Sequence, residues 1–293
     1  MTQTPITRRQ VLAGLGAVGL VAAGPRLVRA ARGEPAFTRY TLAQSTTGGP
    51  DLRIAWYETY NGDYQEDSGR FTGGPGLQPT NSSFDAAAEA GRFVDTTADA
   101  EGEAVGAGAV VDLGNVMPGD EGAVVVGLLA DAADATVWFR LRLDATPENG
   151  LVEPERTAGD ATDAVGELQD AVRVALWYDD STLGGCNGET DGSEGFVTSL
   201  SSLGDLDGTL ADVADATESD EPADEGVRLD FDLLGSGCLP ANTQRCVGFR
   251  WAVPASVANE VQTDGVSFAL EFATVPCGEA TNPFTGASTE AGR

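Results

Sequence analysis

Two stretches of the chain, residues 246–254 (CVGFRWAVP) and residues 266–273 (VSFALEFA), decide the fold class. In both stretches a large apolar side chain occupies every second position. Successive side chains of a β-strand point to opposite faces, so this period of two predicts strands with one buried face. The apolar positions are Val247, Phe249, Trp251 and Val253 in the first stretch and Val266, Phe268, Leu270 and Phe272 in the second. Four further stretches alternate in the same way, at residues 52–56, 137–143, 172–176 and 227–233.

The remaining patterns complete the expected fold. Residues 123–129 are apolar on both faces, which is typical of a central strand. Helical periodicity is confined to residues 209–216. We therefore expect an all-β protein, a two-sheet antiparallel sandwich of about eight to ten strands with one short helix. Long surface loops rich in Gly, Pro and acidic residues are expected at 61–83, 145–165 and 217–226.

The charge of the chain excludes several classes of partner and of chemistry. The 293 residues include 46 acidic and 17 basic side chains, a formal net charge of -29, and no histidine. Nucleic acids and anionic membranes would repel such a protein. Without histidine there is no Ser-His or Cys-His dyad and no imidazole metal site. The composition resembles that of halophile proteins, in which molar salt shortens the Debye length to about 3 Å, and we expect nearly every Asp and Glu to face solvent.

The N-terminal residues have the pattern of an export signal. Arg8 and Arg9 precede a short apolar run at 11–24, as in twin-arginine (Tat) signals, and this run is shorter than the roughly 20 residues of a spanning helix. Cleavage after Ala30 is expected, with an uncleaved membrane anchor as the alternative. The Tat translocase and a signal peptidase would then be partners during export, with only transient membrane contact. We expect a secreted or cell-surface protein.

The expected domain organisation is simple. A signal peptide at 1–30 is followed by a lead segment at 31–50, a single β-sandwich domain at 51–277 and a loose tail at 278–293. Asn81 begins a glycosylation sequon, which is a weak sign of a surface loop.

The four cysteines are an even set, which in an oxidising compartment predicts two disulfides. If the strands at 246–253 and 266–277 are antiparallel neighbours, their outer ends meet. This predicts the pair Cys246–Cys277 and leaves Cys186 to pair with Cys238. A four-thiolate zinc site is the alternative, although the chain has no CxxC pair.

Two turns carry a family resemblance. The segment Asn115-Val116-Met117-Pro118-Gly119-Asp120 resembles the N-x-x-P-G-D turn of the TasA/camelysin family, secreted proteins with a SipW-dependent-type signal peptide. Asn259-Glu260-Val261-Gln262, which leads into the last long strand, is similar to the Asn-x-x-Gln turn of that family. Residues 52–62 and 246–254 resemble the first and penultimate strands of its halophilic archaeal members.

The residues of these turns also have local structural roles that do not depend on the family resemblance. Pro118 fixes φ at the second position of a tight turn, Gly119 supplies a positive φ, and Asp120 can cap the next backbone N–H. Asn259 and Gln262 could cap a loop that directs the last strand across the sheet. We expect all of these positions to set strand geometry and none to be catalytic.

The resemblance implies a jelly-roll sandwich that polymerises into fibres or pili by donor-strand exchange. A segment near the mature N-terminus would add as a strand to the next copy or to a sibling subunit, and a contact of this kind propagates. The candidate donor is residues 36–43, with Phe37, Tyr40 and Leu42 as its apolar side chains. An ordinary first strand of its own sheet, or a disordered lead, is the alternative.

Two other functions are alternatives to this structural one. Camelysin members have been labelled metallopeptidases, but HExxH is impossible without histidine, and Asp179-Asp180 is the nearest carboxylate pair. A monomeric surface module could bind calcium at Asp205-Leu206-Asp207-Gly208, which lacks the downstream Glu of an EF-hand. Such a module could instead bind glycan on Trp138, Trp177 and Tyr178. No catalytic residue, metal site or cofactor is predicted.

Overall fold

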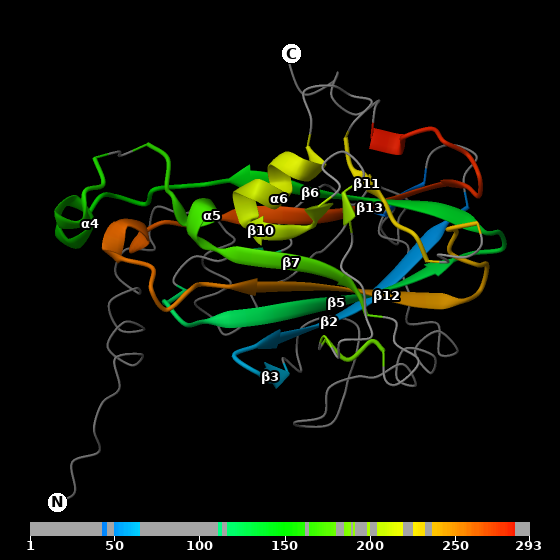
Figure 1. The fold of residues 1–293 in the computed structure, drawn as a ribbon, viewed down its shortest axis with the longest axis horizontal. Helices are drawn as coiled ribbons and strands as arrows, with labels where there is room; N and C mark the ends of the chain where they lie inside the picture. Colours follow the sequence, from blue (N-terminus) through cyan, green and yellow to red (C-terminus); the bar gives the residue numbers. More distant parts are fainter. Residues whose placement is uncertain are drawn as a thin grey trace, which may run out of the picture.

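The computed structural model describes residues 43–45, 50–64, 111–112, 116–161, 164–179, 185–188, 190, 198–199, 204–218, 225–231 and 236–284. Within them the chain forms two main β-sheets with few helices, and the long strands run along the long axis of the molecule (Figure 1). Several predicted residues lie outside the described ones, namely Arg8, Arg9, Ala30, Phe37, Tyr40, Leu42, Asn81, Asn115 and Asp180.

The larger sheet has six strands in the order β10-β7-β12-β5-β2-β3, and all its neighbours are antiparallel. Its central strand β5 is buried on both faces, as the unbroken apolar run at 123–129 predicted. The strands are β2 (Leu52–Tyr60), β3 (Asp63–Tyr64), β5 (Glu121–Ala130), β7 (Arg173–Tyr178), β10 (Asp207–Thr209) and β12 (Gln244–Ala252).

The second sheet has the order β1-β13-β6-β11, and β4 also pairs with β13. The β1–β13 pair is parallel and the other pairs are antiparallel. The strands are β1 (Ala43–Ser45), β4 (Val111–Asp112), β6 (Ala135–Ala145), β11 (Val227–Arg228) and β13 (Ser267–Pro276). A separate two-stranded sheet joins β8 (Thr198–Ser199) to β9 (Gly204–Asp205).

The core lies between the two main sheets. Apolar side chains of β12 face those of β13, and the rings of Phe249 and Phe268 lie 5.5 Å apart between centroids. The expectation that these two strands are neighbours in one sheet is therefore wrong. The 14 residues Val253–Val266 between them carry the chain from one sheet to the other, so the same alternation buries both strands in a shared core.

The disulfide pairing predicted from that adjacency is also wrong. All four cysteines form disulfides, but the bonds join Cys186 to Cys246 and Cys238 to Cys277. Cys246 lies in β12 beside the end of β7, and the N–H of Cys186 bonds to the carbonyl oxygen of Asp179, which directly follows β7. Cys277 follows the end of β13, where Ala135 pairs with both Pro276 and Leu239, so Cys238 is brought alongside. Each bond thus joins segments that already meet through backbone pairing.

Helices occur at more places than the single one predicted. The helix α6 (Leu210–Thr217) agrees with the periodicity at 209–216, and Thr209 caps it by accepting the N–H of Asp212 at 3.0 Å. The helix α4 (Glu153–Ala158) lies within the stretch expected to be a loop, with a proline in its first turn. The chain also forms α5 (Leu168–Ala171) and the short 3-10 helix η2 (Asn259–Val261).

The strand expected over 227–233 is shorter than predicted. Val227–Arg228 form β11 and residues 229–231 lie outside it, although the N–H of Leu229 still bonds to the carbonyl oxygen of Val137. Of the tail expected at 278–293 the structure describes residues 278–284, in which 278–281 are exposed and Asn282 and Phe284 are buried. Phe284 is buried under the guanidinium of Arg140, which lies 4.5 Å from the ring centroid.

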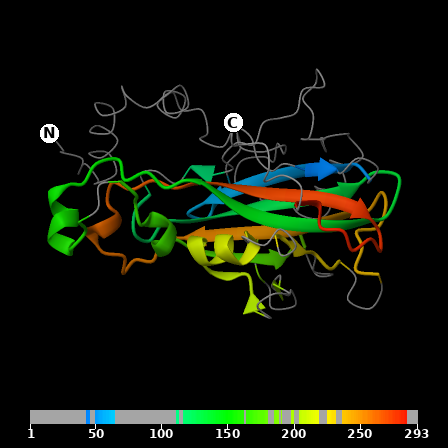
Figure 2. The same ribbon diagram turned by 90° about the horizontal axis from the view of Figure 1, so that it is seen from above.

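One end of the sandwich is closed by α4 and by the turn that contains η2. Both views place the green helix α4 next to the orange η2 turn at the same end of the molecule (Figures 1 and 2). This end is where the chain gathers buried acidic side chains.

Candidate functional site

Several carboxylates are buried, contrary to the expectation that nearly all of them face solvent. Among the residues that the structure describes, seven acidic ones are at most 9% exposed. Three of them meet at the α4 end of the sandwich, and we call these three, Glu148, Glu155 and Asp264, the acidic cluster. The other four are Glu58, Asp179, Glu225 and Glu271.

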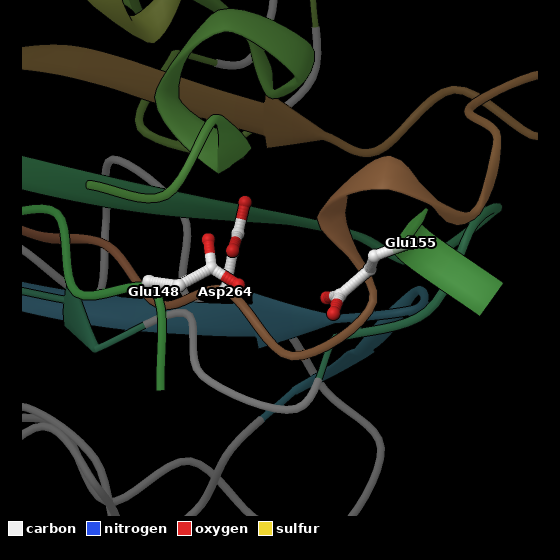
Figure 3. Close-up of side chains that lie close together, drawn as sticks. All are labelled: Glu148, Glu155 and Asp264. Carbon is white, nitrogen blue, oxygen red and sulfur yellow. The ribbon is translucent and has the colours of Figure 1, made fainter. Parts of the chain in front are cut away.

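The acidic cluster is assembled from three segments that are distant in the sequence. Glu148 follows β6, Glu155 belongs to α4, and Asp264 lies between η2 and β13. The segments are tied together by backbone hydrogen bonds, such as that from the Gly265 N–H to the Pro147 carbonyl oxygen at 2.8 Å. The carboxylates of Glu148 and Asp264 lie side by side, and Glu155 reaches towards them from α4 (Figure 3).

Glu155 has a full set of partners. One of its carboxylate oxygens accepts the N–H of Val152 at 2.5 Å, at the start of α4. The other accepts both the N–H and the hydroxyl of Thr263, each at 2.7 Å. Glu155 therefore holds the first turn of α4 against the segment that leads into β13.

Asp264 is only half satisfied. Its Oδ2 accepts the N–H of Glu167 at 2.6 Å, which fixes the loop before α5. Its Oδ1 is buried and has no hydrogen-bond partner. Burial raises the pKa of Asp264, and hydrogen bonding from the Glu167 N–H opposes this rise.

Neither carboxylate oxygen of Glu148 receives a hydrogen bond. The residue is 3% exposed, and both oxygens are shielded from solvent. Burial is the largest cause that raises the pKa of Glu148 to about 7. The next is the hydrogen bond that the protonated Glu148 carboxyl donates to Asp264, and the negative charges of Asp264, Glu155 and Asp160 add to the rise. One of its carboxylate oxygens lies within 4.8 Å of one oxygen each of Glu155 and Asp264, and Glu148 forms a second group of this kind with Asp160 and Glu167.

Two of the buried carboxylates elsewhere in the sandwich, Glu225 and Glu271, are neutralised by arginine. Glu271 bonds to Arg140 at 2.5 Å and to Arg142 at 3.3 Å, and Glu225 bonds to Arg140 at 3.1 Å. No such ion pair reaches Glu148, Glu155 or Asp264 from the part of the chain that the structure describes. The acidic cluster therefore offers hard oxygen donors without an internal counter-charge, and such donors suit Ca²⁺ and Mg²⁺.

The carboxylate considered for peptidase chemistry has a structural role. Asp179 is fully buried, and its two oxygens accept the N–H groups of Asn187 at 3.1 Å and Gly188 at 2.7 Å. These bonds hold the loop that carries Cys186. Asp179 is therefore an anchor for that disulfide loop, with both oxygens engaged.

The three aromatic residues considered for glycan binding do not share a surface. Trp177 is 1% exposed, so it offers no platform. Trp138 is half-buried in β6, which belongs to the other sheet. The Tyr178 hydroxyl accepts the N–H of Asp230 at 2.8 Å, and its ring packs edge-on against Phe231. The proposed calcium turn at 205–208 is also not a turn, because its residues belong largely to β9 and β10.

The turn at Met117–Asp120 has the predicted form. The N–H of Asp120 bonds to the Met117 carbonyl oxygen at 2.8 Å, and Gly119 has a φ of 94°. The Asp120 side chain, however, accepts the N–H of Met117, three residues earlier in the chain, at 2.9 Å. The prediction that it caps the following backbone N–H is not met. It also accepts the hydroxyl of Tyr60 at 2.6 Å and so joins the turn to the end of β2.

The second family-like turn is closed by its main chain. The N–H of Gln262 bonds to the Asn259 carbonyl oxygen at 3.2 Å, and both side chains are exposed. The expectation that the two side chains cap the loop is wrong. The main-chain bond closes this turn without a side-chain cap.

The sequence contained one overlooked sign of the acidic cluster. Glu153-Pro154-Glu155 places proline in a first helical turn and a glutamate three residues after Val152, which is the spacing of a helix N-terminus. That pattern could have predicted α4 and the inward position of Glu155. The meeting of Glu155 with Glu148 and Asp264 has no local signal.

Two further observations bear on the setting of the protein. The disulfides indicate an oxidising environment. Among the described residues, no helix has the length and apolar character needed to cross a membrane.

Comparison with known proteins does not assign the chain to a family. No protein-family model matches the chain, and no curated protein matches it either.

Proposed function

We propose that this protein is an exported structural subunit of the cell surface or extracellular matrix that joins to further copies, or to sibling subunits, by strand addition. The proposal includes the jelly-roll arrangement and the Tat-type export that the sequence predicts. The observation that carries it is the edge of β13, on which the end of the lead segment lies.

The long strand β13 is covered unequally on its two sides. On one side it pairs with β6 along its whole length, from Ser267 to Pro276. On the other side it pairs with two short strands, β1 opposite Phe272–Thr274 and β4 opposite Ser267 and Phe268. A long strand edge held by such short partners is a template on which another strand can pair.

The lead segment is held in a way that suits exchange. The strand β1 has three residues and runs parallel to β13, and parallel pairing is slightly less stable per residue than antiparallel pairing. Each backbone hydrogen bond contributes only about 0.5–1.5 kcal/mol net. Exchange of this segment for that of a neighbouring copy would therefore break few contacts, and the candidate donor at 36–43 shares Ala43 with β1.

The rest of the molecule supports a structural role. Two disulfides and a continuous core between the sheets give a rigid body, and the net charge of -29 keeps such a body soluble in concentrated salt. Each subunit would receive one donor strand and supply another, so the contact would repeat along a fibre.

Negative-stain electron microscopy of the mature protein in molar salt tests the proposal. We expect filaments from the wild type and none from the triple variant Phe37→Asp, Tyr40→Asp and Leu42→Asp. The matched control replaces Thr38 and Thr41, on the intervening positions, by aspartate and should still form filaments. Filaments from the triple variant, or a strictly monomeric wild type in sedimentation at high concentration, would contradict strand donation.

A further inference from the structure

We propose that Glu148, Asp264 and Glu155 bind a divalent cation, Ca²⁺ in preference to Mg²⁺, at the α4 end of the sandwich. This site is independent of strand addition. It is also distinct from the Asp205-Leu206-Asp207-Gly208 segment considered above.

The unsatisfied state of Glu148 is the first argument. A buried carboxylate without a hydrogen-bond donor is costly, and proteins normally pair it or coordinate it to a metal. Glu148 is 3% exposed, has no donor to either oxygen and points into the acidic cluster (Figure 3). The Oδ1 of Asp264, also buried and without a partner, lies in the same cluster.

The spacing of the oxygens is the second argument. One oxygen from each of Glu148, Glu155 and Asp264 lies within 4.8 Å of the others. A Ca²⁺ ion binds oxygen ligands at about 2.3–2.6 Å, so one ion can contact oxygens with this separation. Glu148 and the Oδ1 of Asp264 are the main ligands, because the Glu155 oxygens already accept hydrogen bonds from Val152 and Thr263.

The donor set decides the class of cation. It consists of carboxylate oxygens alone, the chain has no histidine, and all four cysteines are in disulfides. Such donors suit hard cations, and soft or borderline metals would require nitrogen or sulfur ligands. Ca²⁺ is favoured over Mg²⁺ because it accepts irregular sets of six to eight oxygens, including water, whereas Mg²⁺ demands near-ideal octahedral geometry.

The bound ion would join three segments. It would tie the chain after β6 to α4 and to the segment before β13, which meet here through a few hydrogen bonds.

The competing explanation is that Glu148 and Asp264 share a proton and bind no metal. In that case the protonated Glu148 donates to Asp264, and both acids are satisfied without an ion. The two explanations differ in whether Ca²⁺ binds and in what Glu148→Gln does to that binding.

Isothermal titration calorimetry and thermal unfolding test the site. The mature protein is freed of metal with EDTA, dialysed into molar KCl at pH 8, and titrated with CaCl₂ or MgCl₂. The molar salt suppresses weak binding to surface acids. The variants are Glu148→Gln and Asp264→Asn, and the matched control is Asp215→Asn, which removes an exposed acid from α6.

We expect one Ca²⁺ per chain in the wild type and the control, with an unfolding temperature about 5–10 °C higher at 100 times Kd. Glu148→Gln should weaken binding at least tenfold and lose most of this shift, and Mg²⁺ should produce a smaller one. Asp264→Asn provides the same comparison if Glu148→Gln does not fold. No Ca²⁺ heat and no shift in the wild type is the result expected if the two acids share a proton and bind no metal, and undiminished binding by both variants would place the ion elsewhere. Either result would overturn the proposal.

Discussion

Replacing Cys186 and Cys246 together by alanine is expected to lower the free energy of unfolding by about 4.3 kcal/mol. A disulfide restricts the unfolded chain, and this loss of chain entropy grows with the logarithm of the loop length. The Cys186–Cys246 bond closes a loop with a sequence separation of 60, from which the entropy relation gives the figure of about 4.3 kcal/mol.

The second disulfide closes a shorter loop and should contribute slightly less. Cys238 and Cys277 are 39 residues apart, so their double alanine variant should lose about 3.9 kcal/mol. Urea unfolding followed by circular dichroism, without reductant, measures both values. The two double variants should also remain free of new disulfides, because each leaves one native pair intact.

Tryptic mapping without reduction tests the pairing itself. The chain has arginine at 173, 228, 245, 250 and 293, so each cysteine falls in a peptide of its own. The structure predicts that peptide 174–228 is linked to 246–250 and that 229–245 is linked to 251–293. Linkage of 174–228 to 229–245 would refute the connectivity and, with it, the placement of β12 and β13 in opposite sheets.

Three other predictions concern packing and charge, and urea unfolding measures each. Arg140→Ala should lower the free energy of unfolding by about 3–5 kcal/mol, because it removes the cation of a buried ion pair. Arg53→Ala, which removes the cation of an exposed pair, should lower it by at most about 1 kcal/mol. Equal losses in the two variants would contradict this reasoning. Gly248→Ala should cost about 1–3 kcal/mol, because a Cβ there would lie 2.2 Å from the Trp177 ring, and an unchanged stability would show that the ring can move. Capping hydrogen bonds at the start of α6 lower the pKa of Asp212, so its stabilising effect is present above about pH 4 and is lost as the pH falls through the lowered pKa. The stability difference between wild type and Asp212→Asn should therefore shrink in acid, and a constant difference would argue against the cap.

The alternating stretches predicted most of the long strands because each strand carries its own evidence. The patterns at 52–56, 137–143 and 247–253 correspond to β2, β6 and β12. A strand with one buried face must alternate, whichever strand it pairs with. The helix α6 was likewise predictable, since its apolar face and its Thr209 cap are local.

The candidate site was much less predictable. In a chain with 46 acidic residues, Glu148 and Asp264 look like the many others that face solvent. They become distinctive only because the chain after β6 and the chain before β13 meet at one end of the sandwich. Burial removes the water that would hydrate their carboxylates there, and a buried carboxylate requires a hydrogen-bond donor, a counter-charge or a metal ion.

The sequence by itself determined that the chain is built of strands, that its cysteines are paired and that its chemistry excludes imidazole. These properties belong to single segments or to the composition, so they do not depend on which segments meet. Only the tertiary structure decided which sheet each strand joins, which cysteines bond and which carboxylates lose their water. The physical reason is that alternation fixes which face of a strand is buried but not its neighbours, because any apolar face can cover any other.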